Sequence, residues 1–179
     1  MKTREAYPIV HAALAWGWGL LWPPLSVALL SAVALAPRGP DDPTPVSALL
    51  PLLALHWWAA TARPASIALL AVAAGLAMDG LSHGPLGYWA IIDLAAVALA
   101  DLSRAQLARG PLEHGAVIAL HLGALAVLQA GLMFACTLSL PGFAALAGQA
   151  LGAVLVYPVL ILGLSLTSAR PVHYGRGLA

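Results

Sequence analysis

The sequence predicts an all-α membrane protein with almost no mass outside the bilayer. Of its 179 residues, 61% are hydrophobic and only 8% are charged, and the mean hydropathy is +0.90. A soluble domain is about half apolar and about a quarter charged. The eight Lys or Arg and seven Asp or Glu residues are therefore too few to cover a water-facing surface. The same composition excludes a disordered chain, which needs low hydrophobicity and high net charge.

The remaining composition narrows the possible partners and cofactors. The net charge is +1 and there is no basic tract, so nucleic-acid binding is not expected. The single cysteine, Cys136, lies in an apolar run, which leaves neither an intrachain disulfide nor a cysteine metal cluster to expect. The length favours one integral membrane domain over residues 1–179.

Apolar runs divide the chain into six predicted transmembrane helices. A bilayer core about 30 Å thick is crossed by a helix of about 20 apolar residues, with a range of about 17–25. The predicted spans cover residues 8–36, 46–62, 65–81, 86–100, 116–138 and 143–167. Pro23-Pro24 interrupts the first run, which is nonetheless longer than the apolar part of a signal peptide, so we expect it to be retained. Trp57-Trp58 and Tyr88-Trp89 are expected in the aromatic belts at the membrane surfaces.

The basic residues orient this arrangement. With six spans, seven of the eight basic residues face the same side, and only Arg38, beside Asp41 and Asp42, faces the other. The seven are Lys2, Arg4, Arg63, Arg104, Arg109, Arg170 and Arg176. Because short cytoplasmic loops carry an excess of Lys and Arg, the pattern predicts that both termini are cytoplasmic in a multi-pass membrane protein.

Two carboxyl groups fall inside the predicted spans. Asp79 and Asp93 flank the turn around Gly84-Pro85 at similar distances, so we expect them at similar depth in the outer half. A central Asp costs about 2.5–3.5 kcal/mol on insertion scales and is normally buried or functional. Either the two groups are protonated, because burial and mutual repulsion disfavour the charged form, or they cap helix ends. For Asp93 a functional or inter-helix role is an open alternative.

Polar and small residues in other spans provide further candidates. His56 and His121, with His11, lie toward the inner halves of their spans, and we interpret them as partners in hydrogen bonds between helices. They lack a metal-binding spacing, so no metal site is expected. Gly148 and Gly152 form a GxxxG motif in the last span, which allows close packing either within the chain or in a homodimer.

One segment resembles a known family. An Arg-Pro turn at Arg63-Pro64 precedes a span that ends in Gly-Leu-Ala-Met-Asp-Gly-Leu-Ser-His-Gly-Pro-Leu-Gly over residues 75–87. This pattern is similar to that of MreD, the bacterial rod shape-determining membrane protein family. The matching positions are Arg63, Pro64, Gly75, Leu76, Asp79, Ser82, Pro85, Leu86 and Gly87, and Gly84 belongs to the same hairpin. The placement of His83-Gly84 departs from the family pattern, so the turn is expected to differ locally there.

The resemblance implies a non-enzymatic scaffold in the cell-elongation machinery (the elongasome). Members of this family are thought to pair with MreC, and through it with MreB, RodA and a penicillin-binding transpeptidase in lateral peptidoglycan synthesis. It also implies a location in the bacterial inner (cytoplasmic) membrane and a fold similar to the S components of energy-coupling-factor transporters. Membrane lipids are expected neighbours, and no cofactor is implied.

The residues themselves leave a second function open. The chain has no Walker loop, no G-x-S-x-G and no H-E-x-x-H, so an enzyme is not expected. Asp79 and Asp93 could instead bind a proton, a cation or a basic solute near an outward cavity. The alternative to a scaffold is therefore a small-solute or ion transporter, or a substrate-binding membrane component.

Overall fold

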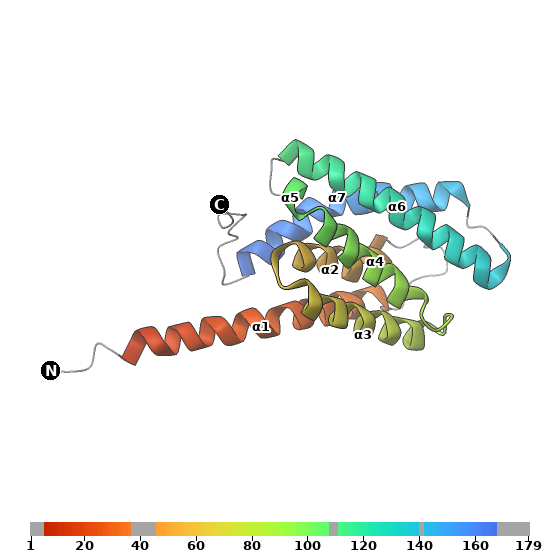
Figure 1. Cartoon of the computed structure of the whole chain (residues 1–179). Coiled ribbons are helices and arrows are strands. Elements are labelled where there is room, and N and C mark those ends of the chain that lie inside the picture. The colour runs from red at the N-terminus through yellow and green to blue at the C-terminus, as the bar shows by residue number, and fades with distance from the viewer. Residues whose placement is uncertain (1–5, 37–45, 108–110, 140–141, 168–179) are drawn as a thin grey trace.

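The computed structural model describes residues 6–36, 46–107, 111–139 and 142–167, with the side chains of the first helix described from Leu20 onward. The described residues form helices and no strand. In chain order the elements are α1 (Ala6–Ala34), the 3-10 helix η1 (Val46–Leu49), α2 (Leu50–Thr61), α3 (Pro64–Ser82), α4 (Tyr88–Leu102), α5 (Arg104–Leu107), α6 (Pro111–Thr137) and α7 (Phe143–Thr167). They pack as one bundle, and the N-terminal part of α1 extends beyond it (Figure 1).

Each of the six predicted segments coincides with a helical segment, so the all-α class is confirmed. One local expectation is wrong. Pro23 and Pro24 lie inside α1 without interrupting it, since a helix in a bundle tolerates lost N–H donors when other groups satisfy the backbone.

Three helices are long and apolar enough to cross a membrane by length and composition. They cover Ala65–Ser82, Gly115–Thr137 and Ala144–Thr167, and Leu20–Ala34 is a shorter apolar helical stretch. Their outward faces carry large apolar side chains: Leu69 is 76% exposed, Val127 74% and Val159 71%. Apolar faces of this extent are typical of helices that contact lipid. The chain therefore has the helices of a membrane protein.

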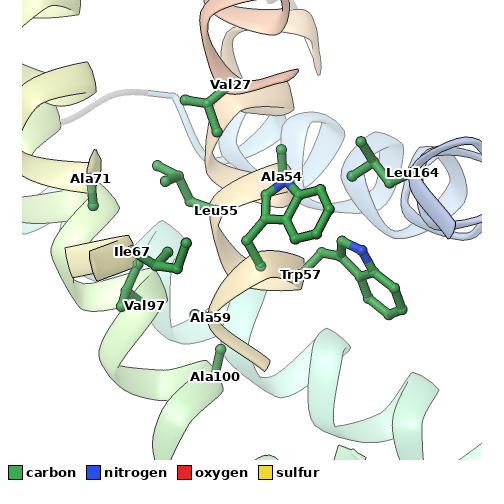
Figure 2. Packing of buried hydrophobic residues seen from close by; sticks show 11 residues of the cluster. Val27, Ala54, Leu55, Trp57, Ala59, Ile67, Ala71, Val97, Ala100 and Leu164 are labelled. Atoms are coloured by element: carbon green, nitrogen blue, oxygen red, sulfur yellow. The ribbon is translucent and has the colours of Figure 1, made fainter. Parts of the chain in front are cut away.

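The centre of the bundle is α2. Its residues from Pro51 to Ala59 are all buried, and it contacts α1, α3, α4 and α7. A helix that is apolar on all sides is normally buried on all sides. With 12 residues it is about 18 Å long, and the longer helices around it cover its length. Figure 2 shows side chains from these five helices packed together.

The two tryptophans of α2 belong to this core. Trp57 is 3% exposed and Trp58 is 7% exposed, and both pack in the cluster with Val27 and Leu164. The indole nitrogen of Trp58 donates a hydrogen bond to Ser26 Oγ at 2.9 Å. The expected place of this pair in an aromatic belt is therefore wrong, because α2 is enclosed by other helices and has no lipid-facing side.

Candidate functional site

The family-like segment forms a tight hairpin of α3 and α4. Arg63 is extended (φ −72°, ψ 121°) and Pro64 opens α3, a position where the missing N–H of proline costs nothing. At the far end His83 and Gly87 adopt left-handed conformations, with φ of 55° and 92°. Non-glycine residues seldom adopt such a conformation, which His83 does here. The expected departure of this turn from the family pattern stays a prediction.

Gly75 lets the two helices touch. A Cβ atom built on Gly75 would lie 2.3 Å from Ala90 Cα and 2.7 Å from Trp89 C, both backbone atoms of α4. Only a residue without a side chain fits this crossing. This glycine of the motif therefore sets the separation of α3 and α4.

Asp79 connects the end of α3 to the start of α4 through hydrogen bonds of its buried side chain. Its side chain is 1% exposed, and its carboxylate oxygens accept hydrogen bonds from Gly87 N at 2.7 Å and Trp89 N at 2.9 Å. Gly87 precedes α4 and has no side chain with which to cap it. Asp79 supplies from the preceding helix the acceptor that an N-cap residue normally provides, and its negative charge favours the N-terminal end of the helix dipole. Of the two alternatives for Asp79, the structure shows the helix-end cap.

The other motif residues line the turn. Ser82 Oγ lies 3.5 Å from the Asp79 carbonyl oxygen, and the Pro85 carbonyl accepts a hydrogen bond from Tyr88 N at 3.2 Å. Gly84 is exposed, and its N–H donates to the Asp79 carbonyl at 3.2 Å. These groups shape the turn and leave Asp79 as its only buried charge among the described residues.

Asp93 has a different environment. It is 2% exposed and close enough to Asp79 for an electrostatic interaction. No described residue forms a hydrogen bond with its carboxyl group. The two carboxyl groups therefore interact electrostatically, but only Asp79 has a structural task.

A chain of polar side chains, which we call the histidine chain, connects the helices at another point. Its members are Ser103, His121, His56 and Tyr157, which come from the α4–α5 junction, α6, α2 and α7. His56 Nε2 lies 2.8 Å from His121 Nδ1, and His56 Nδ1 lies 2.8 Å from Tyr157 Oη. His121 Nε2 lies 3.0 Å from Ser103 Oγ. The predicted hydrogen bonds between helices through His56 and His121 are confirmed.

Three of the four side chains of the histidine chain are almost completely shielded from solvent. His56, His121 and Tyr157 are 3%, 4% and 2% exposed. A cavity of about 10 Å³ adjoins these three residues and is otherwise lined by leucine and isoleucine. This volume is about the least that holds one water molecule. The side chains therefore satisfy one another rather than being solvated.

Sequence reasoning missed two members of the histidine chain. Tyr157 is the one tyrosine within the last predicted span, and a buried tyrosine hydroxyl usually needs a partner, so it carried a usable signal. Ser103 carried no signal in the sequence beyond its place next to Arg104. His11 lies outside the described side chains.

The GxxxG motif makes no close contact at its first glycine. Gly148 is exposed, and a Cβ atom added there would meet nothing within 4 Å. Gly152 is half-buried. The packing alternative within the chain therefore fails at Gly148, and the homodimer alternative stays a prediction.

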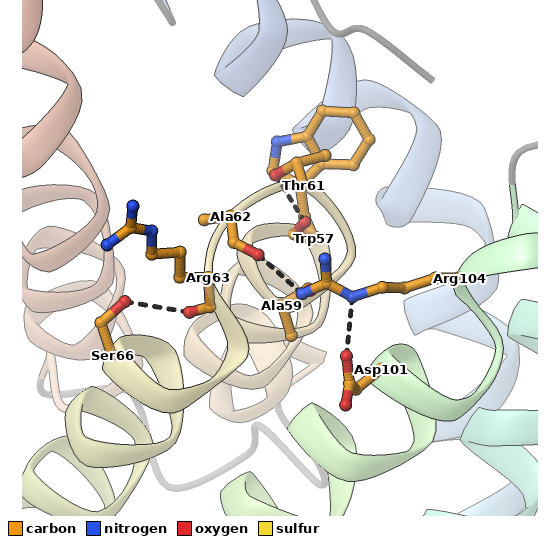
Figure 3. A network of polar contacts seen from close by, with 8 residues as sticks. All are labelled: Trp57, Ala59, Thr61, Ala62, Arg63, Ser66, Asp101 and Arg104. Carbon is orange, nitrogen blue, oxygen red and sulfur yellow. Dashed lines mark hydrogen bonds and ion pairs between the residues drawn. The ribbon is translucent and has the colours of Figure 1, made fainter. Parts of the chain in front are cut away.

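Arg104 holds the end of α2. Its Nη2 donates hydrogen bonds to the Ala62 carbonyl at 2.6 Å and to the Ala59 carbonyl, and its Nε pairs with Asp101 Oδ1 at 2.7 Å (Figure 3). The last carbonyls of a helix lack partners within the helix, and a cation there also interacts favourably with the helix dipole. Arg63 follows Ala62, so the turn of Arg63 and the side chain of Arg104 lie at the same end of the bundle, as predicted.

This contact gives a testable difference between two arginines. We expect Arg104→Ala to lower the free energy of unfolding by about 2 kcal/mol, because hydrogen bonds to charged groups contribute about 1.5–3 kcal/mol. The matched control is Arg63→Ala, since Arg63 is exposed and its guanidinium forms no hydrogen bond or ion pair with the described residues. Its effect should stay within about 0.5 kcal/mol. Unfolding in mixed detergent and denaturant measures both, and equal losses would contradict the capping role.

Comparison with known proteins adds no relative. No family model, curated protein or solved structure matches the chain. Among the described residues no group of three or more His, Cys, Asp or Glu side chains gathers in a way that could hold a metal ion. Function is therefore argued from the hairpin and the histidine chain.

Proposed function

We propose that the protein is a non-enzymatic membrane scaffold of the MreD type. In this role it binds an MreC-like partner and, through it, acts with MreB, RodA and a penicillin-binding transpeptidase in lateral peptidoglycan synthesis and rod shape. The observation that carries the proposal is the α3–α4 hairpin. Gly75, Asp79 and Gly87, three residues of the family-like motif, each have a specific task in its geometry.

The mode of action follows from the distribution of polar and apolar surface. The buried polar groups Asp79, His56 and His121 lie inside the bundle, whereas the outward faces of α6 and α7 are rich in exposed leucine and valine. A single-span partner would pack its apolar helix against such a face, with lipid as the competing neighbour. A homodimer through the Gly148 face would use the same kind of contact.

The proposed topology has six spans, with both termini in the cytoplasm. It is supported by the shared position of Arg63 and Arg104 and by the apolar helices. The test replaces Cys136, the single cysteine, with serine and introduces either Ser139→Cys or Ala105→Cys, both at exposed positions. A membrane-impermeant maleimide should label the first variant in intact spheroplasts and the second only after permeabilisation. The reverse pattern would refute the orientation.

Depletion and co-purification test the function itself. Cells that lose the protein should round up and lose insertion of wall material along their sides. The tagged protein, extracted in mild detergent, should retain a single-span partner with a periplasmic domain. Depleted cells that stay rod-shaped with normal wall insertion would contradict the scaffold.

Asp93 supports one alternative, a transporter or substrate-binding component. A buried carboxyl group without a hydrogen bond from the described residues is a usual feature of ion and proton pathways. Asp79 favours it less, because its carboxylate already accepts two backbone N–H groups. Thermal unfolding with candidate solutes distinguishes the two functions. A bound solute at a hundredfold excess over Kd stabilises the folded state by about 2.7 kcal/mol, whereas a scaffold shows no saturable shift.

A further inference from the structure

The histidine chain leaves no ring nitrogen without a partner. His56 contacts Tyr157 through Nδ1 and His121 through Nε2, and His121 contacts Ser103 through its second nitrogen. The two rings are 5.2 Å apart between centroids, with an interplanar angle of 63°. Such a contact requires one hydrogen between the facing nitrogens. The number of protons that the pair can carry follows from this requirement.

Two neutral rings fit the chain in two ways. A neutral imidazole has one N–H and one acceptor nitrogen, and a hydroxyl group can donate or accept. If His56 donates from Nε2, then His121 donates from its own Nε2 to Ser103, and the Tyr157 hydroxyl donates to His56. Reversing every bond gives the second arrangement. All three hydrogen bonds are made in both.

One added proton also preserves every bond. A charged His56 donates from both nitrogens, to Tyr157 and to His121, and neutral His121 still donates to Ser103 Oγ. Moving the shared hydrogen across the 2.8 Å contact places the charge on His121 instead. A second proton would put an N–H on each of the facing nitrogens, which breaks the bond and leaves two like charges in contact.

We propose that His56 and His121 form a proton-binding site that takes up a single proton and shares it between the two rings, with Ser103 as the connection to the surface. Ser103 is half-buried at the junction of α4 and α5, whereas the rings and Tyr157 are buried. The site is independent of the proposed scaffold function, because it rests on the ring contacts alone.

The described charged groups around the site do not provide a counter-ion for a proton on the two rings. Arg104 is paired with Asp101, so α4 and α5 bring no net charge next to Ser103. Asp93 lies about 15 Å away from Ser103 along α4. The remaining titratable or charged groups of the described side chains in the packed helices are Tyr88 on α4, Cys136 on α6, Tyr157 on α7, and Arg63, Asp79 and His83 at the two ends of α3. The described side chains of α1 add none. The cavity of about 10 Å³ has no space for a hydrated counter-ion.

The experiment is a pH series on the full-length protein in detergent micelles, with ¹⁵N-labelled histidine and nuclear magnetic resonance detection. We expect a nitrogen–nitrogen coupling across the bond from His56 Nε2 to His121 Nδ1. As the pH is lowered over the range in which the protein stays folded, both rings should change with one common midpoint, and their combined change should equal one proton. His83 is exposed in the α3–α4 turn and lies outside the histidine chain, so its signals are assigned separately from those of the pair.

Two variants separate the shared site from two ordinary histidines. His121→Gln should abolish the coupling and leave His56 with a different midpoint. Ser103→Ala should keep both the coupling and the common midpoint, because it leaves the ring contact intact. Separate midpoints that add up to two protons, or rings that take up none while the protein stays folded, would overturn the proposal. If His121→Gln fails to fold, the series on the unaltered protein decides alone.

Discussion

Gly75→Ala is expected to lower the free energy of unfolding by about 3 kcal/mol, the upper end of the usual effect of overpacking. The new methyl group would lie 2.3 Å from Ala90 Cα and 2.4 Å from Ala90 N. Backbone atoms cannot rotate away as a side chain does, so α3 and α4 must separate along their length. Equilibrium unfolding in mixed detergent, followed by tryptophan fluorescence, measures the loss.

The matched control lies on the same helix. Gly80 is exposed, and a Cβ atom added there meets nothing within 4 Å. Gly80→Ala should be neutral or stabilising by up to about 1 kcal/mol, because alanine is the better helix former. If the two variants unfold alike, the close contact of α3 with α4 is not what makes Gly75 important.

Asp79→Ala is expected to cost about 3 kcal/mol as well. It removes a buried acceptor of two hydrogen bonds and leaves the N–H groups of Gly87 and Trp89 without their partner, and each orphaned buried donor costs about 1–3 kcal/mol. The charge at the start of α4 is lost too, with its favourable interaction with the helix dipole. The same unfolding measurement checks the result.

Two further variants identify the cause of that loss. Asp79→Asn keeps one amide oxygen as an acceptor and should lose about half as much stability. Asp101→Asn removes a carboxylate whose side chain is 43% exposed and which pairs with Arg104, and an exposed ion pair contributes less than about 1 kcal/mol. If Asp101→Asn lowers the free energy of unfolding as much as Asp79→Ala does, the loss of a negative charge, rather than the loss of the buried cap, is responsible.

The sequence was sufficient to predict the helices, since apolar periodicity, Pro and Gly act locally. The last predicted span, 143–167, agrees with α7 at both ends. It was also sufficient to single out Asp79, because a charge in an apolar run is costly unless it is buried or functional. Gly75 was singled out only through the family resemblance.

Other features depend on which helices become neighbours, and local pattern does not contain that information. Trp57 and Trp58 resemble a membrane-surface pair in sequence, yet other helices, α1, α3, α4 and α7 among them, enclose α2. His56 and His121 have no shared spacing because their contact joins residues far apart in the chain. Arg104 looked like a topology signal and is in addition a helix cap.

The enclosure of α2 has a consequence for the order in which the protein folds. Its final carbonyls are held by Arg104, and His56 contacts His121 on α6 and Tyr157 on α7, which are all synthesised later. A nascent chain that has emerged only as far as α3 therefore holds α2 without these contacts. Arg104 and the C-terminal helices then complete the packing of the helix at the centre of the bundle.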